Sequence, residues 1–144
     1  MATSLSKLEQ LPMLRHLPQV TLGHLALNAT ERWFNKREVV LQKGERPHGL
    51  MFLLEGRLQG MDFTTDGREV GLYFLSAGDY FGEVALVDNQ PYPEFITTLT
   101  RSLVVSLPKD IVRPVLFAVS RIAEDLCLRL AARLRQDSAY RKIL

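Results

Sequence analysis

Short apolar runs separated by turn residues make up the middle of the chain. Leu50–Leu54 is a continuous apolar run that ends at a Glu-Gly pair, which predicts a buried strand. Arg57–Phe63 is the next predicted strand, and Asp66-Gly67 is the dipeptide typical of a tight hairpin. A third strand is predicted at Glu69–Leu75, where alternation places Val70, Leu72 and Phe74 on one face.

Further strands are predicted on both sides of this region, at Val39–Leu41, Phe95–Thr100 and Leu103–Leu107. About seven or eight short strands recur at a spacing of roughly 8–12 residues, with no regular alternation of strand and helix. This pattern is typical of an antiparallel jelly roll or barrel and argues against a Rossmann-type parallel sheet. We therefore predict a mainly β fold, a jelly roll or double-stranded β-helix, with flanking helices.

Amphipathic segments precede and follow the predicted sheets. Leucines at steps of three residues predict helical structure near the N-terminus. Ser120–Leu144 predicts a helix about 37 Å long, which is too long for a barrel of this size to cover. Its apolar face predicts a two-fold homodimer, which we favour over a helix lying along its own barrel. The residues of this face step by four: Ile122, Leu126, Leu130 and Leu134.

The pattern predicts a single domain over residues 1–144, with a helical segment at 1–30, a β region at 31–108 and helices at 109–144. The 144 residues are 47% hydrophobic and carry a net charge of +2, so neither a disordered tail nor a strongly basic nucleic-acid binder is indicated. Cys127 is the single cysteine, which excludes an internal disulfide framework and a multi-cysteine metal or cluster site. No apolar run is long enough to span a membrane, and we expect a soluble, cytoplasmic protein.

The segment from Gly78 to Leu86 carries the most suggestive chemistry in the chain. Its pattern predicts a loop that becomes a short helix, with Gly82 allowing close approach of the backbone to a ligand. The amides of Val84 and Ala85 would open that helix and could meet an anion. Glu83 can accept hydrogen bonds from sugar hydroxyls. A phosphate joined to a ribose fits this combination, although a Glu in a first helical turn also simply complements the helix dipole.

The order of parts resembles the cyclic-nucleotide-binding domain of Crp/Fnr-type bacterial transcription regulators. The resemblance covers nearly the whole chain and includes Gln42–Glu45, Met51–Leu58, Thr98–Ser102 and the Gly-Asp-Tyr-Phe-Gly-Glu-Val-Ala-Leu segment. It implies that this segment is a phosphate-binding cassette, in which Glu83 takes the ribose 2′-hydroxyl, Gly82 permits close approach, and the Val84 and Ala85 amides meet the cyclic phosphate. It also implies that the long helix closes over the base through three positions, Arg133, Asp137 and Ser138.

The sequence departs from the family pattern at the phosphate-binding arginine. Members that bind cyclic AMP carry this Arg nine or ten residues after the cassette Glu, where this chain has Tyr92 and Pro93, followed by Glu94. Loss of such a charge-assisted contact, worth about 1.5–3 kcal/mol, weakens binding by about 10- to 100-fold. The candidates are therefore a cyclic nucleotide (cAMP or cGMP) bound weakly, another small-molecule effector, or no ligand.

The family's DNA-reading helix-turn-helix has no counterpart in this sequence, so DNA would be bound only through a domain absent from this chain. We expect a fragment of a longer regulator, with a stand-alone sensor as the alternative.

The residues also bear on three alternative functions. The basic final helix permits direct DNA binding, but arginines beside a dimer face are more often solvated. Haem binding through His48 has no local signature. A cupin-type enzyme needs clustered metal ligands, which the three histidines do not provide, and no nucleophile–base pair is visible. We predict a non-catalytic protein without a metal site.

Overall fold

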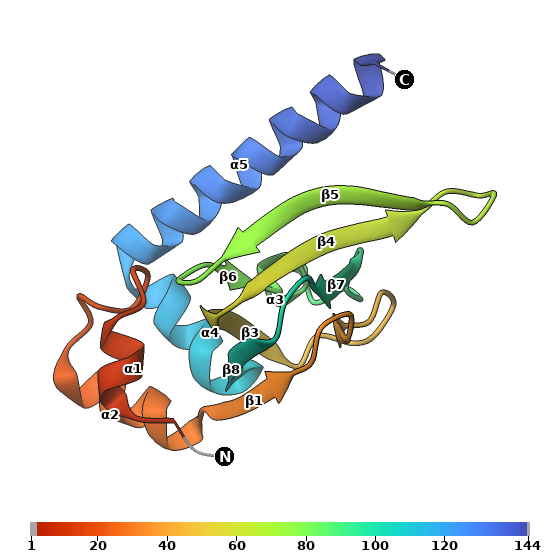
Figure 1. Ribbon diagram of the computed structural model, residues 1–144. Helices are drawn as coiled ribbons and strands as arrows, with labels where there is room; N and C mark the ends of the chain where they lie inside the picture. The colour runs from red at the N-terminus through yellow and green to blue at the C-terminus, as the bar shows by residue number, and fades with distance from the viewer. Residues whose placement is uncertain (1–2, 144) are drawn as a thin grey trace. The chain divides into compact units, whose positions relative to one another are not determined.

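The computed structural model describes residues 3–143, with side chains described up to residue 138. Figure 1 shows two β-sheets and, near the N-terminus of the chain, two short helices that precede the strands. The helices are α1 (Leu5–Glu9), α2 (Gln19–Asn28), α3 (Glu83–Asp88), α4 (Lys109–Ala118) and α5 (Ser120–Ile143). The strands are β1 (Thr30–Phe34), β2 (Val39–Leu41), β3 (Gly49–Glu55), β4 (Arg57–Phe63), β5 (Glu69–Ser76), β6 (Tyr80–Phe81), β7 (Phe95–Thr98) and β8 (Ser102–Pro108).

The strands form two four-stranded antiparallel sheets, in the orders β1-β8-β3-β6 and β2-β7-β4-β5. Strands adjacent in the sheets are mostly distant in sequence, as in a jelly roll. The predicted fold class is confirmed. The Asp66-Gly67 hairpin is also confirmed, because Gly67 adopts φ 87° and its amide donates to the Thr64 carbonyl at 3.0 Å.

The hydrophobic core lies between the two sheets and fills the space that their inward-facing side chains share. β3 contributes most heavily, since the first five of its seven residues are buried, as a strand between two covered faces requires. The main core cluster comprises Phe34, Leu41, Met51, Leu53, Leu58, Leu75, Phe81, Ala85, Tyr92, Ile96 and Val104. It includes residues from the β6–α3 region, so the candidate cassette is built directly onto the core.

One strand-face prediction is wrong. Gly60 pairs with Tyr73 but Met61 pairs with Gly71, so β5 carries a bulge at Leu72. The bulge shifts the alternation of side chains along β5. Val70 and Phe74 therefore lie on opposite faces instead of one, and Phe74 is 61% exposed on the outer face of its sheet.

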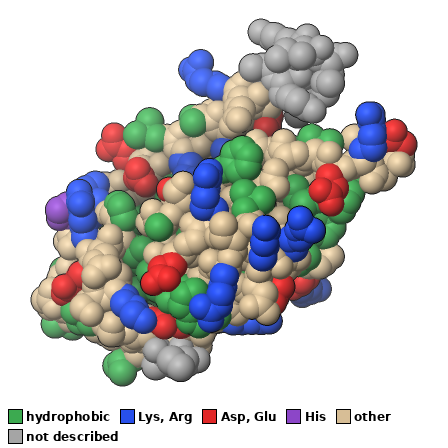
Figure 2. Space-filling view, viewed as in Figure 1, with side chains coloured by type: hydrophobic (Ala, Val, Ile, Leu, Met, Phe, Trp, Pro, Cys, Tyr) green, Lys and Arg blue, Asp and Glu red, His purple; other side chains and the backbone are tan. Residues whose placement is uncertain are grey.

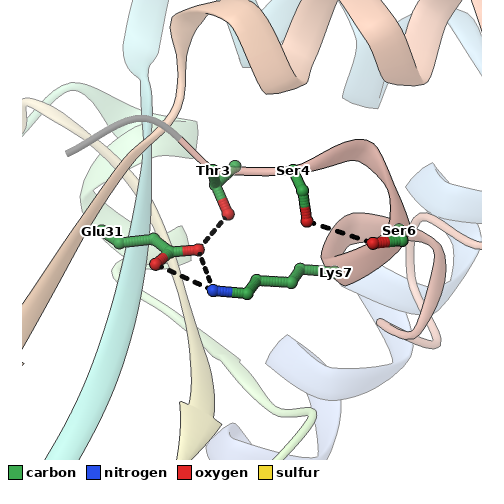
Figure 3. Close-up of polar contacts among 5 residues, drawn as sticks. All are labelled: Thr3, Ser4, Ser6, Lys7 and Glu31. Carbon is green, nitrogen blue, oxygen red and sulfur yellow. Dashed lines mark hydrogen bonds and ion pairs between the residues drawn. The ribbon is translucent and has the colours of Figure 1, made fainter.

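The N-terminal segment is attached to the sheet through Glu31 of β1. Lys7 of α1 donates to both carboxylate oxygens of Glu31, at 2.9 and 3.0 Å, and the Thr3 hydroxyl donates to one of them (Figure 3). Burial alone would raise the pKa of Glu31, but the hydrogen bonds from Lys7 and Thr3 and the charge of Lys7 outweigh it, so the pKa lies below its usual value. The pair therefore joins α1 to β1 by a charge-assisted contact.

The chain divides into two compact units, one ending at Val112 and the other beginning at Arg113. The first contains α1, α2, both sheets and α3, and the second contains most of α4 and all of α5. Within α5, Ile122 and Leu126 are buried and Leu130 is half-buried, whereas Leu134 is 70% exposed. The four residues of the predicted dimer face thus differ in exposure, and the dimer stays a prediction.

Candidate ligand-binding cassette

The candidate site begins where β6 ends against β3. Phe81 pairs with Met51 and Tyr80 with Phe52, which fixes the direction in which the chain leaves the sheet. Gly82 follows in the left-handed conformation, with φ 85° and ψ 6°, and is the N-cap of α3. The predicted transition from loop to short helix is confirmed, with the helix beginning at Glu83.

The backbone conformation favours glycine at position 82, and a close neighbour leaves little room for a side chain. Its positive φ is strained for any residue with a Cβ. A Cβ at this position would also lie 2.7 Å from the Cε of Met51 and 3.4 Å from the carbonyl oxygen of Gly49. The turn therefore lies directly on β3, and a Cβ there would displace the flexible end of the Met51 side chain, while the positive φ is the feature that favours glycine.

Glu83 and Ala85 face the protein interior. The Glu83 side chain belongs to a residue only 2% exposed, and Ala85 is fully buried in the main core cluster, whereas Val84 is half-buried. A buried carboxylate is stable only where polar groups hydrogen-bond to it, and a ligand that carries hydroxyl groups can supply such hydrogen bonds. The first-turn amides of α3 have no acceptor within the helix, so the arrangement can present donors beside a carboxylate.

The segment after α3 contains a tyrosine that is anchored at both its backbone and its hydroxyl. Tyr92 is buried, its backbone bonds to Gly44 and Glu45, and its hydroxyl accepts a hydrogen bond from the His48 amide at 3.2 Å. Burial raises the pKa of the Tyr92 phenol, although hydrogen bonds from backbone amides, including that of His48, oppose the rise. The Tyr92 hydroxyl thus holds the β2–β3 loop through this hydrogen bond. Pro93, beside it, is exposed.

Glu94 reaches the barrel interior through a contact that the sequence does not reveal. Its residue is 8% exposed, and its carboxylate accepts a hydrogen bond from the Tyr73 hydroxyl at 2.5 Å. The Tyr73 ring lies against the backbone of Gly60, where a Cβ would come within 2.3 Å of the Tyr73 Cζ atom. Tyr73 also packs against the main core cluster, which contains Ala85 of the cassette. A carboxylate and a phenol thus lie at the edge of the same core as the cassette.

The remaining predicted site residues lie on α5, in the second unit. Arg133 is half-buried, and Asp137 and Ser138 are exposed. Their predicted closure over a base stays a prediction. In the described part of the chain, no group of three or more His, Cys, Asp or Glu residues is arranged to hold a metal ion. No helix among residues 3–143 combines the length and hydrophobicity needed to cross a membrane.

The family is decided by a match to the model of the cyclic nucleotide-binding domain, which covers residues 31–118 and so more than half of the chain. The chain belongs to the cyclic nucleotide-binding domain family. The matched region of this domain runs from β1 to the end of α4 and includes the entire cassette. The resemblance expected from the sequence is confirmed at this level.

Relatives of the domain occur in different kinds of protein. A CRP-like cAMP-activated global transcriptional regulator of Mycobacterium tuberculosis is 31% identical over 105 residues, which is 73% of this chain and 47% of that protein. The potassium channel KOR1 of Oryza sativa is 28% identical over 86 residues, covering 60% of this chain and 10% of the channel. The chain thus spans less than half the length of either relative.

The fold of the domain is shared with solved structures. The sensor domain of the transcriptional regulator DNR from Pseudomonas aeruginosa superposes with a TM-score of 0.77 at 21% identity, covering 93% of this chain and 90% of that one. At this identity the likeness shows the fold alone. The jelly roll with N-terminal helices and a long C-terminal helix is therefore a shared architecture.

Sequence reasoning missed the residues that determine the interior around the cassette. Met51 was predicted only as part of a buried strand, and its contact with Gly82 depends on the pairing of β3 with β6. The hydrogen bond of Tyr73 to Glu94 has no local signal in the sequence, because the two residues are 21 positions apart. A glycine opposite an aromatic residue in a predicted hairpin, as at Gly60, was the single local signal available.

Proposed function

We propose that this cyclic nucleotide-binding domain is the non-catalytic effector-sensing part of a Crp/Fnr-type transcription regulator, and that its cassette does not hold cyclic AMP tightly. One comparison supports the regulator over a channel. The Mycobacterium tuberculosis relative covers more of this chain, at higher identity, than the potassium channel does.

The observation that carries the ligand proposal is the combination of an intact turn with an altered neighbouring segment. Gly82 and the buried Glu83 provide the geometry for a ribose and a phosphate. The segment that follows supplies Tyr92, which holds a loop, and the buried carboxylate of Glu94, with no Lys or Arg before Arg101. A cyclic phosphate therefore meets amide donors without a cationic side chain from this segment, and binding is weak or redirected to a less anionic effector.

Calorimetric titration of the purified chain with cyclic AMP and cyclic GMP tests this directly. We expect no heat at micromolar nucleotide and at most weak, submillimolar to millimolar binding. Micromolar affinity would overturn the ligand proposal, because another group would then have to neutralise the phosphate. That result would leave the family assignment and the regulator proposal in place.

An arginine introduced at position 93 tests the cause of the weak binding. Pro93→Arg should strengthen cyclic AMP binding by about 10- to 100-fold, which corresponds to one charge-assisted contact. Pro91→Arg is a matched control, because Pro91 is exposed in the same loop and the substitution adds the same charge. Equal affinities for the two variants, or no change for Pro93→Arg, would show that the missing arginine is not the cause.

We further propose that the domain acts as a cytoplasmic homodimer through α5, and that effector binding changes how the paired helices meet and so positions DNA-binding domains outside this chain. The exposed Leu134, at 70%, supports a partner surface on the predicted dimer face of α5. Light scattering of the chain and of Leu134→Asp tests the dimer. A monomer at high concentration for the unaltered chain would exclude this pairing.

A further inference from the structure

A hollow of about 400 Å³ lies on the outer face of the β2-β7-β4-β5 sheet and extends to the turn between β1 and β2. We call it the outer hollow, and its lining includes Arg37, Gln59, Met61, Glu69, Thr97 and Thr98. Gln59 of β4 pairs with Thr97 of β7. The strand neighbours of this pair, Leu58 and Ile96, belong to the main core cluster, so alternation places the pair on the side of the sheet away from the core. A volume of this order suits a small ligand.

Gly71 of β5 helps to keep the outer hollow open. It pairs with Met61, and a Cβ at Gly71 would lie 2.5 Å from Nε2 of Gln59. The Gln59 amide therefore lies over the β5 backbone, where a larger residue at position 71 would place its own side chain. Met61, which is only 7% exposed, adds an apolar surface to the lining. The hollow thus combines apolar contact with an amide that can both donate and accept hydrogen bonds.

One cationic and one anionic side chain line the outer hollow, and their backbones lie far apart along β4. The Arg37 amide donates to the Thr98 carbonyl at 3.2 Å, and Thr98 pairs with Leu58. Glu69 pairs with Phe63, five residues further along β4, which is roughly 17 Å of strand. No ion pair among the described residues involves Arg37 or Glu69. The two charges thus face the same hollow from its two ends, and both are available to a ligand.

The backbone of Arg37 is fixed at the end of the hollow by a turn that is bonded to Thr98. The Thr98 hydroxyl donates to the Asn35 carbonyl at 2.5 Å and accepts from the Glu38 amide at 2.9 Å, and the Thr98 amide donates to the Glu38 carbonyl at 2.9 Å. Arg37 itself adopts φ 65°, a left-handed conformation that glycine or asparagine adopts more readily than arginine. Such conformations gather at binding sites, which favours a role for the Arg37 side chain.

We propose that the outer hollow binds a free peptide of two or three residues in its zwitterionic form. The peptide carboxylate would pair with the Arg37 guanidinium, and its ammonium group with the Glu69 carboxylate. An extended peptide spans about 3.5 Å per residue, so two or three residues bridge the space between the two side chains, whereas the charges of a single amino acid lie too close together. An apolar side chain of the peptide would cover Met61. This inference is independent of the ligand bound at the cassette.

Ligands of a single charge fit the same hollow less well. A phosphate or a simple carboxylate would pair with Arg37 but would be repelled by Glu69, and a simple amine would meet the reverse situation. Figure 2 shows Lys and Arg side chains interspersed with Asp and Glu over the visible face, so that face as a whole does not favour ligands of one charge. Binding of an anion alone is therefore the competing outcome of the test.

The test is an NMR titration of the isotopically labelled chain with the dipeptide alanyl-leucine at physiological salt. We expect saturable shifts that centre on the amides of Gln59, Met61, Glu69 and Thr97. The N-acetylated dipeptide and the C-terminal amide of the dipeptide should each bind about tenfold more weakly, because each lacks one of the two charges. Shifts that centre elsewhere, no saturation at tens of millimolar dipeptide, or equal binding of acetate and the dipeptide would overturn the proposal.

Matched variants assign each end of the peptide to its side chain. Arg37→Gln should weaken binding of alanyl-leucine by about tenfold but leave binding of its C-terminal amide within about twofold, because the amide has no carboxylate for Arg37 to hold. Glu69→Gln should show the same pattern with the N-acetylated dipeptide. Lys36→Gln, in the same turn as Arg37, and Glu55→Gln remove equal charges outside the lining and should change the affinity by less than about twofold. Equal losses in the lining variants and their controls would refute the assignment.

A variant without a charge change tests the hollow itself. Gly71→Leu places a side chain where the Gln59 amide lies, and the backbone of Gly71 does not have the positive φ that would strain it. We expect this variant to lose binding of the dipeptide while the amide shifts of β3 and β8 stay as in the unaltered chain. Unchanged affinity in Gly71→Leu would show that the dipeptide binds elsewhere.

Discussion

Gly82→Ala is the most informative substitution in the cassette, because a second glycine provides a matched reference. Gly82 and Gly67 have nearly the same backbone angle, with φ 85° and 87°. A Cβ at Gly67 would meet no atom within 4 Å, whereas one at Gly82 would lie 2.7 Å from the Met51 Cε. The two variants therefore share the cost of the left-handed conformation and differ in the steric contact with β3.

The expected free energies follow from these two terms. Placing alanine in the left-handed region costs about 1–2 kcal/mol, and the reduced entropy of the unfolded chain returns roughly 0.4–1 kcal/mol. Gly67→Ala should therefore lower the free energy of unfolding by about 0–1.6 kcal/mol. In Gly82→Ala, the Met51 methyl group must also retreat within a packed core, which adds about 0.5–1.5 kcal/mol through an off-rotamer side chain.

Urea denaturation of the two variants and of the unaltered chain measures this difference. We expect Gly82→Ala to be the less stable variant by about 1 kcal/mol, which is roughly 0.5–1 M in the urea midpoint at an ordinary slope. Introducing Met51→Val removes the clashing methyl group and should bring the costs of the two glycine substitutions together. If Gly82→Ala is no more damaging than Gly67→Ala, the Met51 methyl group moves aside without measurable cost, and the steric penalty assigned to Gly82→Ala is refuted.

Three further substitutions test polar contacts of the barrel. The pKa of Glu31 is lowered in the folded chain, so the stability that ionised Glu31 contributes is present above its unfolded pKa, near 4.5, and is lost as the pH falls through its folded pKa. Lys7→Met should therefore make the urea midpoint fall less steeply between pH 6 and pH 3. An unchanged pH dependence of the midpoint would contradict this account. Tyr73→Phe removes the donor to the Glu94 carboxylate and should cost about 1.5–3 kcal/mol in unfolding free energy. Tyr92→Phe loses a hydrogen bond to a neutral amide and should cost only about 0.5–1.5 kcal/mol, so the reverse order in thermal denaturation would exclude a charged partner for Tyr73.

The strands and the cassette turn follow from local sequence. The continuous apolar run of β3 specifies a strand covered on both faces, and Asp66-Gly67 specifies a hairpin through its own backbone preferences. Gly82 and the helix-compatible residues after it specify the turn into α3 in the same way. Each of these features depends on residues within a few positions of one another, so the local sequence is enough to predict it.

The interior around the cassette was decided only by the tertiary structure. The bulge at Leu72 depends on how β5 pairs with β4, and pairing register is chosen by packing rather than by either strand alone. The hydrogen bond of Tyr73 to Glu94 joins positions 21 residues apart, and Arg101, in the turn before β8, meets Trp33 because β8 pairs with β1. A linear pattern records which side chains are present, but non-local strand pairing determines which of them meet, and with that the chemistry that the surface and the interior offer.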